Sequence, residues 1–459
     1  MLAVALLLQE TIQEYDRRAR EVYDQAVVAH ARQAKALKTR GLYRWAREEY
    51  AKVLHLQPDH EVARRDLGYE REGGAWVATD GGMPRSDKAQ EDLEEQAAKH
   101  LKELDRAAAG LAKEHLTLAA WCAENGLAEL AREHRLEAHA LDPTDPKVAE
   151  ALGFTKSALL PVASSPDAVA LFDAFRSDRE KAALGEIKEA KDGYGEAGAP
   201  EGFRVAHGAR VGIESTYMDE TMLRELCRWG DHMFAASHAL LGVEAPKKER
   251  RYWFVFAERE GYEAVTKWLQ GDGWESWMDT SSYHNNVRAY RVSQKREDEI
   301  PSHVMAHQVA QFVVRRRLDK VPENKAAIVE GFAILGEFLG AGTNRIWCYR
   351  GEGTGDSGGG RKNYREEAAA LARGMEEMPV VELFGSTLDT LKGKGGSPAA
   401  KAASVVEWLF ARDPAAARAF FTELAGEEAK AATLIAGHFG WTPYEFEEYW
   451  RRWAMAVGR

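Results

Sequence analysis

Apolar residues in the first half of the chain recur with the period of an α-helix. Ala46, Tyr50 and Val53 are spaced i, i+4, i+7, which places them on one face of a predicted helix. Pro58 ends this helix, because proline interrupts the helical hydrogen bonds. The stretch 78–125 is charged and rich in alanine and leucine, which also favours helix. The pattern therefore predicts a helical N-terminal half.

The pattern changes after the glycine-rich segment 193–202, which we interpret as a domain boundary. Alternating or aromatic-rich apolar residues then predict three strands, with helical patterns between them and from residue 301 onwards. The predicted strands are 203–213, 252–257 and 287–292, and the predicted helices between them are 219–241 and 262–269. We expect an α+β fold, mainly α, in which a small sheet is followed by a helical lobe.

Two segments of the N-terminal half repeat each other at one fixed offset. The segment 41–58 reads GLYRWAREEYAKVLHLQP and the segment 126–143 reads GLAELAREHRLEAHALDP. The matching positions are Gly41, Ala46, Leu56 and Pro58 with Gly126, Ala131, Leu141 and Pro143, and Leu67-Gly68-Tyr69 with Leu152-Gly153-Phe154. A glycine permits a tight turn between helices, and a small alanine lets two helices approach closely. We therefore expect the same helix–turn–helix shape in both segments.

These segments resemble the second half of a tetratricopeptide repeat (TPR). The residues that carry the resemblance are Gly41, Tyr43, Ala46, Tyr50, Val53 and Pro58. Such repeats imply either a peptide-binding groove or packing against the rest of the chain. Because only two units repeat, and a free-standing array usually needs about three, packing is the favoured interpretation.

Two segments in the second half carry a recognisable spacing. SHVMAHQVAQFVV, from Ser302, is followed by AIVEGFAILGEFLG, from Ala327. This pair is similar to the zinc helices of the gluzincin metallopeptidases, in which HExxH is followed 18 residues later by a glutamate. His307 stands at the first histidine, Glu330 at the distant glutamate, and Glu337 where a second glutamate often follows. Further on, Thr442 to Glu445 form a capping-box pattern that predicts the start of a last helix.

The resemblance implies a damaged site. Gln308 stands where the family has its general base, and Gln311 stands at the second histidine. A neutral glutamine cannot take a proton from a metal-bound water, and its amide is a poor zinc ligand. Of the expected ligand set only His307 and Glu330 remain, so we expect no catalytic residue and no cofactor. His303 lies four residues before His307, and this pair could hold zinc together with Glu330, although a hydrogen-bonded core histidine is the favoured interpretation.

The resemblances give a domain assignment. We assign residues 1–160 to a helical region with two TPR-like repeats and 161–200 to a helical linker. Residues 201–300 form the strand-containing part of a peptidase-like domain, and 301–459 form its zinc-helix-like and helical C-terminal lobe. The expected partner is a protein or peptide.

Composition limits the remaining function classes. The net charge of -11 argues against nucleic acid, because a phosphate-binding face must be cationic. The three cysteines are far apart and predict neither a disulfide framework nor a cysteine-based zinc site. Met1 to Leu8 are all apolar, far fewer than the roughly 20 residues of a membrane span. No transmembrane segment is therefore predicted, and the apolar start slightly favours export, to a periplasm or cell surface, over the cytoplasm.

These observations support a catalytically inactive, metallopeptidase-like protein that acts as a binding or scaffold module. The alternative is a metal-dependent hydrolase or peptidase with an altered metal site formed by His303, His307 and Glu330. A third hypothesis is a purely structural protein, in which the peptidase-like fold is only a spacer.

Overall fold

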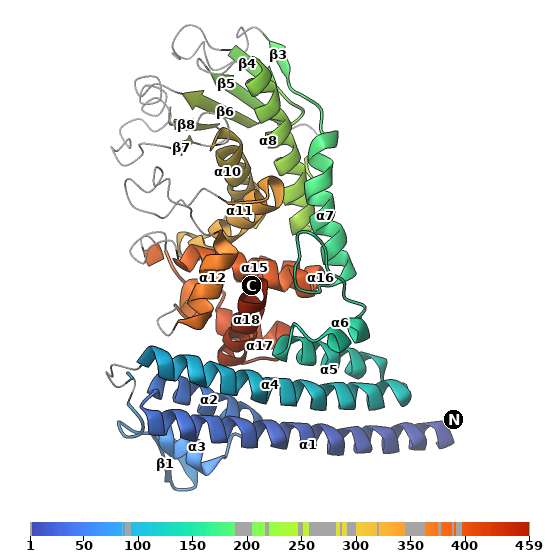
Figure 1. The fold of residues 1–459 in the computed structure, drawn as a ribbon, viewed down its shortest axis with the longest axis vertical. Coiled ribbons are helices and arrows are strands. Elements are labelled where there is room, and N and C mark those ends of the chain that lie inside the picture. The colour runs from blue at the N-terminus through green and yellow to red at the C-terminus, as the bar shows by residue number, and fades with distance from the viewer. Residues whose placement is uncertain are drawn as a thin grey trace. The chain divides into compact units, whose positions relative to one another are not determined.

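A computed structural model describes most of the chain (Figure 1). The described ranges are 2–84, 86–87, 93–188, 204–215, 220–246, 251–256, 281–284, 287–291, 300–318, 321–344, 363–374, 378–387, 390–391 and 397–458. The chain divides into two compact units. The first contains Met1–Pro166, Ala368–Val381 and Lys430–Arg459, and the second contains Asp167–Glu367 and Glu382–Ala429.

The first unit is built from two helical hairpins. Helices α1 (Leu2–Arg40) and α2 (Tyr43–Leu56) pack together as hairpin 1, and α4 (Leu93–Glu124) and α5 (Ala128–Leu141) pack together as hairpin 2. Each hairpin is followed by a short helix, α3 (Glu61–Asp66) or α6 (Pro146–Leu152), and α1 also packs against α4 (Figure 1). Leu37, Ala46 and Val53 are fully buried in the core of hairpin 1.

The predicted repeat is confirmed in shape. Gly41 and Gly126 both adopt a left-handed conformation, with φ of 78° and 75°. The residue after each glycine donates its backbone N–H to the carbonyl five residues before it, over 3.0 Å from Leu42 and 2.8 Å from Leu127. The two turns therefore have the same backbone geometry, because both need a residue that tolerates positive φ.

A small sheet that the sequence analysis did not predict follows hairpin 1. Strands β1 (Tyr69–Glu72) and β2 (Ala75–Ala78) pair antiparallel around Gly73 and Gly74. Both glycines have positive φ, 58° and 91°, as the tight hairpin turn requires. The Gly-Gly dipeptide was the available signal for this turn.

The C-terminal helices belong to the first unit. They are α17 (Ala431–Phe439) and α18 (Pro443–Val457), and α18 packs against α2 and α5. The capping box predicted at Thr442 and Glu445 is present at the start of α18. The structure thus groups 430–459 with the helical repeats, whereas the sequence analysis assigned it to the peptidase-like lobe. The reason is that one face of α18 pairs with the repeats, Glu448 with Lys52 of α2 and Tyr449 with Glu137 of α5.

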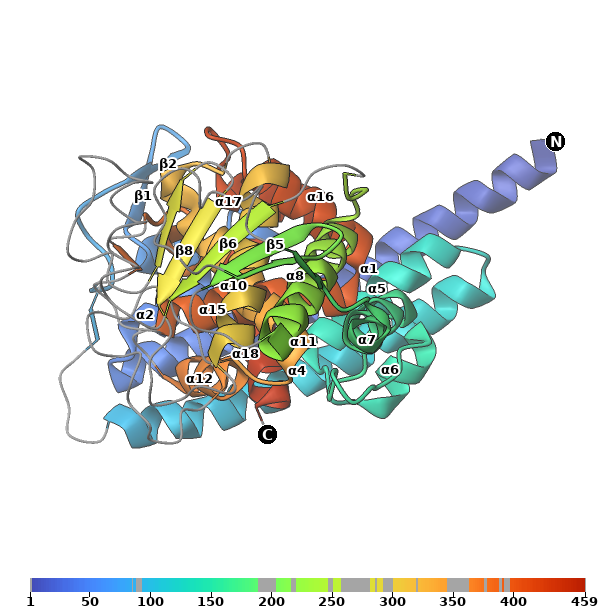
Figure 2. The same cartoon turned by 90° about the horizontal axis from the view of Figure 1, so that it is seen from above.

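The second unit contains a six-stranded sheet with helices. The strands are β3 (Glu186–Lys188), β4 (Arg204–His207), β5 (Val211–Ser215), β6 (Arg251–Phe256), β7 (Ser281–His284) and β8 (Val287–Arg291). Their order is β3-β4-β5-β6-β8-β7, and the pairs β5–β6 and β6–β8 are parallel while the others are antiparallel. Figure 2 shows β5, β6 and β8 side by side. The expected α+β class, mainly α, is confirmed.

The sheet has three more strands than the sequence analysis predicted, and two of them, β3 and β7, lie outside the predicted segments. The predicted strand 203–213 is two strands, because the chain turns at Gly208. The carboxylate of Asp231 accepts hydrogen bonds from the backbone N–H groups of Ala209, Arg210 and Val211, which fixes this turn. A side chain on Gly208 would meet Asp231 at 2.4 Å, so only glycine fits there.

The helices of the second unit follow the predicted pattern where they are described. They are α7 (Pro166–Lys181), α8 (Glu220–Leu241), α10 (Ile300–Arg317), α11 (Ala326–Ala341), α15 (Ser397–Arg412) and α16 (Pro414–Leu424), with a 3₁₀ turn at Glu323–Lys325. The helices α12 (Tyr364–Arg373) and α13 (Val380–Leu383) each have residues in both units. The helix predicted at 219–241 is α8, and the one predicted at 262–269 lies outside the described residues. The segment assigned as a helical linker, 161–200, contains α7 and β3 of the second unit.

Candidate functional site

The two motif segments form the adjacent helices α10 and α11. Every residue from Ala326 to Gly340 in α11 is buried. Two glycines allow this burial. A Cβ on Gly336 would lie 3.1 Å from the Cβ of Ala310 in α10, and one on Gly331 would lie 2.9 Å from the backbone of Ala402 in α15. The small residues of α11 therefore bring its polar side chains close to those of α10.

His307 and Glu330, the two residues that remain of the expected ligand set, lie in contact between these two helices. The distance from His307 Nε2 to Glu330 Oε2 is 3.3 Å, and both side chains are fully buried. The other ring nitrogen, His307 Nδ1, lies 3.2 Å from Glu337 Oε2. The imidazole of His307 is therefore held between two carboxyl groups of the neighbouring helix.

Gln311 completes this group with its amide nitrogen. Gln311 Nε2 donates to Glu330 Oε2 over 3.0 Å and lies 3.2 Å from His307 Nε2. A carboxylate only accepts hydrogen bonds, which fixes the orientation of this amide. His307 then carries its proton on Nδ1, where it donates to Glu337, and accepts at Nε2 from Gln311. One N–H of the Gln311 amide therefore points to Glu330 and the other to His307, and these two side chains also face each other.

Glu337 connects the two histidines of α10. Glu337 Oε1 lies 2.7 Å from His303 Nδ1, and Oε2 faces His307. Burial alone would raise the pKa of Glu337, but its hydrogen bonds with the two histidines lower its pKa below the usual range. We name the buried residues His303, His307, Gln311, Glu330 and Glu337 the histidine–carboxylate cluster.

The cluster does not fit the zinc ion of a gluzincin site. His307 and Glu330 offer two ligand atoms, but the amide nitrogen of Gln311 lies against both and has no lone pair for a metal. Gln308, also buried, supplies no base. Within the described residues, no group of three His, Cys, Asp or Glu side chains is arranged to hold a metal ion.

The structure pairs His303 with Glu337 rather than with Glu330. His303 is directed to Glu337 through Nδ1, whereas Glu330 is contacted by His307 and Gln311. His303 is 5% exposed, so it is a buried histidine with a carboxyl partner, as expected for a core residue. All six residues named from the sequence are buried on α10 and α11, and five of them form the cluster.

A second buried polar group was not anticipated from the sequence. The hydroxyl of Tyr364 donates to Glu407 over 2.5 Å, and Arg365 forms an ion pair with the same carboxylate. Burial, and then the charge of Glu407, raise the pKa of Tyr364 well above its usual value. The Arg365 guanidinium lies 4.3 Å from the ring centroid of Phe338, next to Glu337. These residues come from three separate segments of the chain, so no local sequence pattern predicts their contact.

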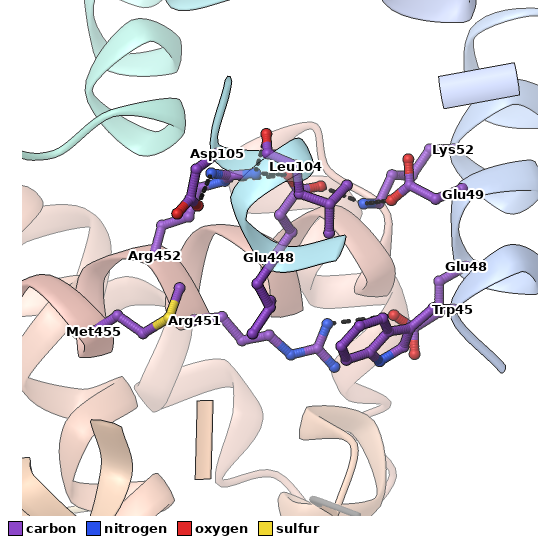
Figure 3. A pocket seen from close by; sticks show the side chains of 11 residues that line it. Trp45, Glu48, Glu49, Lys52, Leu104, Asp105, Glu448, Arg451, Arg452 and Met455 are labelled. Atoms are coloured by element: carbon purple, nitrogen blue, oxygen red, sulfur yellow. Dashed lines mark hydrogen bonds and ion pairs between the residues drawn. The ribbon is translucent and has the colours of Figure 1, made fainter. Parts of the chain in front are cut away.

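The first unit contains a hollow between α2, α4 and α18 (Figure 3). Its walls combine apolar side chains with charges of both signs. The lining residues are Trp45, Glu48, Glu49, Lys52, Leu101, Leu104, Asp105, Glu448, Arg451, Arg452 and Met455. The buried ammonium of Lys52 donates to Glu49 over 2.6 Å and forms an ion pair with Glu448. Burial opposes ionisation of Glu49, but Lys52 and His30 lower its pKa to about 2.

Neither models of known protein families nor curated protein sequences gave a match to this chain. Within the described part of the chain, no helix combines the length and apolar character needed to cross a membrane.

Proposed function

We propose that this protein is a catalytically inactive, metallopeptidase-like binding or scaffold module. The observation that carries the proposal is the amide of Gln311. It lies against His307 and Glu330, the two positions that match the ligands of the gluzincin pattern, and donates a hydrogen bond towards each. In this proposal a neutral side chain replaces the metal as the group that joins the two helices.

The hydrogen bonds of the cluster favour a structural role for it. Buried carboxyl and imidazole groups are costly unless they are paired. Here Glu337 faces two imidazoles, and Glu330 faces an imidazole and an amide. The cluster therefore stabilises the contact between α10 and α11 without a metal, and hydrolysis would also lack a base at Gln308.

The test restores the family pattern in the full chain. The double substitution Gln308→Glu with Gln311→His returns the base and the second histidine. Zinc titration by calorimetry should show no tight binding to the wild type and stoichiometric binding to the double variant. Peptidase activity should be absent from the wild type and should return less readily than zinc binding in the double variant, because second-shell groups that orient the ligands each contribute about 10–100-fold.

Gln308→Glu alone is the matched control, because it returns the base without the third ligand. It should not bind zinc tightly. Tight zinc binding together with peptide cleavage by the wild type would refute the proposal and favour a hydrolase. In that case His303→Ala would show whether His303 is one of the ligands.

A further inference from the structure

We propose that the two hairpins form a receptor for an amphipathic helix, and that α18 is its intramolecular ligand, which the helix of a partner protein can replace. This inference rests on the proposed binding function and names the surface and the kind of partner. We call the residues Glu48, Lys52, Asp105 and Glu137 the receptor surface. The partner helix is expected to carry an acidic residue flanked by aromatic and basic ones, as α18 does.

Equivalent positions of the two repeats contact the same ligand. Lys52 in α2 and Glu137 in α5 are related by the offset of the repeat. Lys52 pairs with Glu448 of α18. Glu137 accepts hydrogen bonds from Trp441 Nε1 over 2.6 Å and from the hydroxyl of Tyr449 over 3.1 Å. Repeat proteins typically recognise a ligand through equivalent positions of successive repeats.

The charges of α18 and of the hairpins are complementary where the two are in contact. Arg451 of α18 donates to Glu48 of α2 over 3.3 Å, and Arg452 donates to Asp105 of α4 over 3.0 Å. Together with the pair of Lys52 and Glu448, these contacts fix the direction and register of the bound helix. Complementary charges set specificity more than affinity, so this surface selects a particular pattern of helix residues.

The bound α18 leaves one donor of the receptor without an acceptor. Trp45 lines the hollow and is 4% exposed, and no described group accepts a hydrogen bond from its Nε1. Arg451 also lines the hollow (Figure 3), but a guanidinium has only donors. A helix with a glutamine at this position could accept from Trp45 and still donate to Glu48. The hollow and the unmet donor indicate that α18 is not the optimal ligand.

The buried charges between α18 and the hairpins also favour replacement of α18 by the helix of a partner. Lys52, Glu448 and Arg452 are all buried. Buried ion pairs add little net stability, because desolvation offsets most of the attraction. The aromatic side chains Trp441 and Tyr449, which donate to Glu137, add to this contact, and a partner helix with similar aromatic residues would replace them.

The experiment measures binding of a fluorescent peptide, residues 440–458 of this chain, to the full-length protein by anisotropy. A tethered helix competes at an effective concentration on the order of millimolar, so the wild type should bind the peptide weakly. In the Glu448→Lys chain the tethered helix is repelled by Lys52, and the peptide should bind at least about tenfold more tightly than to the wild type. A peptide carrying Arg451→Gln should bind this chain more tightly still.

Glu150→Lys is the matched control, since it makes the same charge change at an exposed position of α6. It should bind the peptide as weakly as the wild type. If the Glu448→Lys chain does not fold, Tyr449→Phe removes only the hydrogen bond to Glu137 and should give a smaller increase in affinity. The peptide is checked for cleavage by mass spectrometry.

Unchanged peptide binding in folded Glu448→Lys or Tyr449→Phe chains would refute the receptor. Dimerisation of the Glu448→Lys chain without peptide would assign the site to the tail of a second copy and refute the partner helix. These outcomes concern the first unit, whereas the zinc and peptidase assays report on the second, so the two proposals fail separately.

Discussion

Hairpin 1 and hairpin 2 have the same backbone and different buried chemistry. Their turn glycines share one conformation, and the residues that end α2 and α5, Gln57 and Asp142, have nearly the same dihedral angles, φ/ψ of -135°/85° and -139°/84°. The polar pair between the helices differs. His30 Nδ1 lies 2.8 Å from Glu49 in hairpin 1, while at the matching positions of hairpin 2 His115 Nδ1 lies 3.0 Å from His134 Nδ1.

The difference shows which features the repeat needs. Backbone geometry is set by glycine at the turn and by small apolar residues between the helices, and these match. The polar pair only has to satisfy its own hydrogen bonds, and both a histidine–carboxylate pair and a histidine–histidine pair do so. Hairpin 1 extends its pair through Lys52 to Glu448, whereas Glu137 at the same place in hairpin 2 binds neutral donors.

The largest expected effect comes from removing the cation of Lys52, which pairs with Glu49 and Glu448. Lys52→Met leaves Glu49 and Glu448 buried without their shared cation, and should lower the free energy of unfolding by about 3–5 kcal/mol. The matching change in hairpin 2, Glu137→Met, leaves only neutral donors without an acceptor and should cost about 1–3 kcal/mol. Urea denaturation of both variants at pH 7 measures the two losses. An equal loss, or a larger loss for Glu137→Met, would contradict the comparison.

A second test uses pH on the neutral pair of hairpin 2. Burial, and then the neighbouring His134, lower the pKa of His115 to about 3, and burial lowers the pKa of His134 to about 4. Unfolded histidine has a pKa of about 6.5, so the unfolded state binds more protons between these values and stability falls as the pH falls. From pH 7 to 5 the loss should be roughly 2 kcal/mol per histidine.

Glu49 of hairpin 1 contributes in a different window. Its lowered pKa means that its stabilisation is present above about pH 4.5 and is lost only as the pH falls towards about 2.

His134→Glu would give hairpin 2 the pair of hairpin 1 and should make stability less dependent on pH between 7 and 5. His134→Gln, which removes one titrating group without adding a carboxylate, should have a smaller effect. The denaturation midpoint of each protein is measured at pH 7 and at pH 5. An equal change of midpoint in the wild type and in both variants would refute the role of this pair.

The smallest expected effect tests what the hairpins share. Gly41→Ala and Gly126→Ala each force a side chain into the left-handed region, which costs about 1 kcal/mol. A Cβ on Gly126 would meet no atom within 4 Å, so strain is its main cost. The two losses in thermal denaturation should be similar, and a large difference would show that the turns are not equivalent.

Much of the fold was contained in local sequence patterns. The repeat, the segments of strands β4, β5, β6 and β8, helix α8 and the start of α18 follow from glycine and proline positions, apolar periodicity and a capping box. The contact of His307 with Glu330 is in line with the resemblance to the gluzincin helices, which places these two residues at ligand positions. These are properties of a few neighbouring residues, and the sequence alone determines them.

Other features were decided only by tertiary structure. Nothing local shows that Gln311 donates to Glu330, that Arg365 and Tyr364 meet Glu407, or that α18 packs against α2 and α5. Each joins residues that are distant in sequence, and its formation depends on which apolar faces pack together first. Burial then makes a polar partner necessary, and the partner is whichever side chain the packing places within reach.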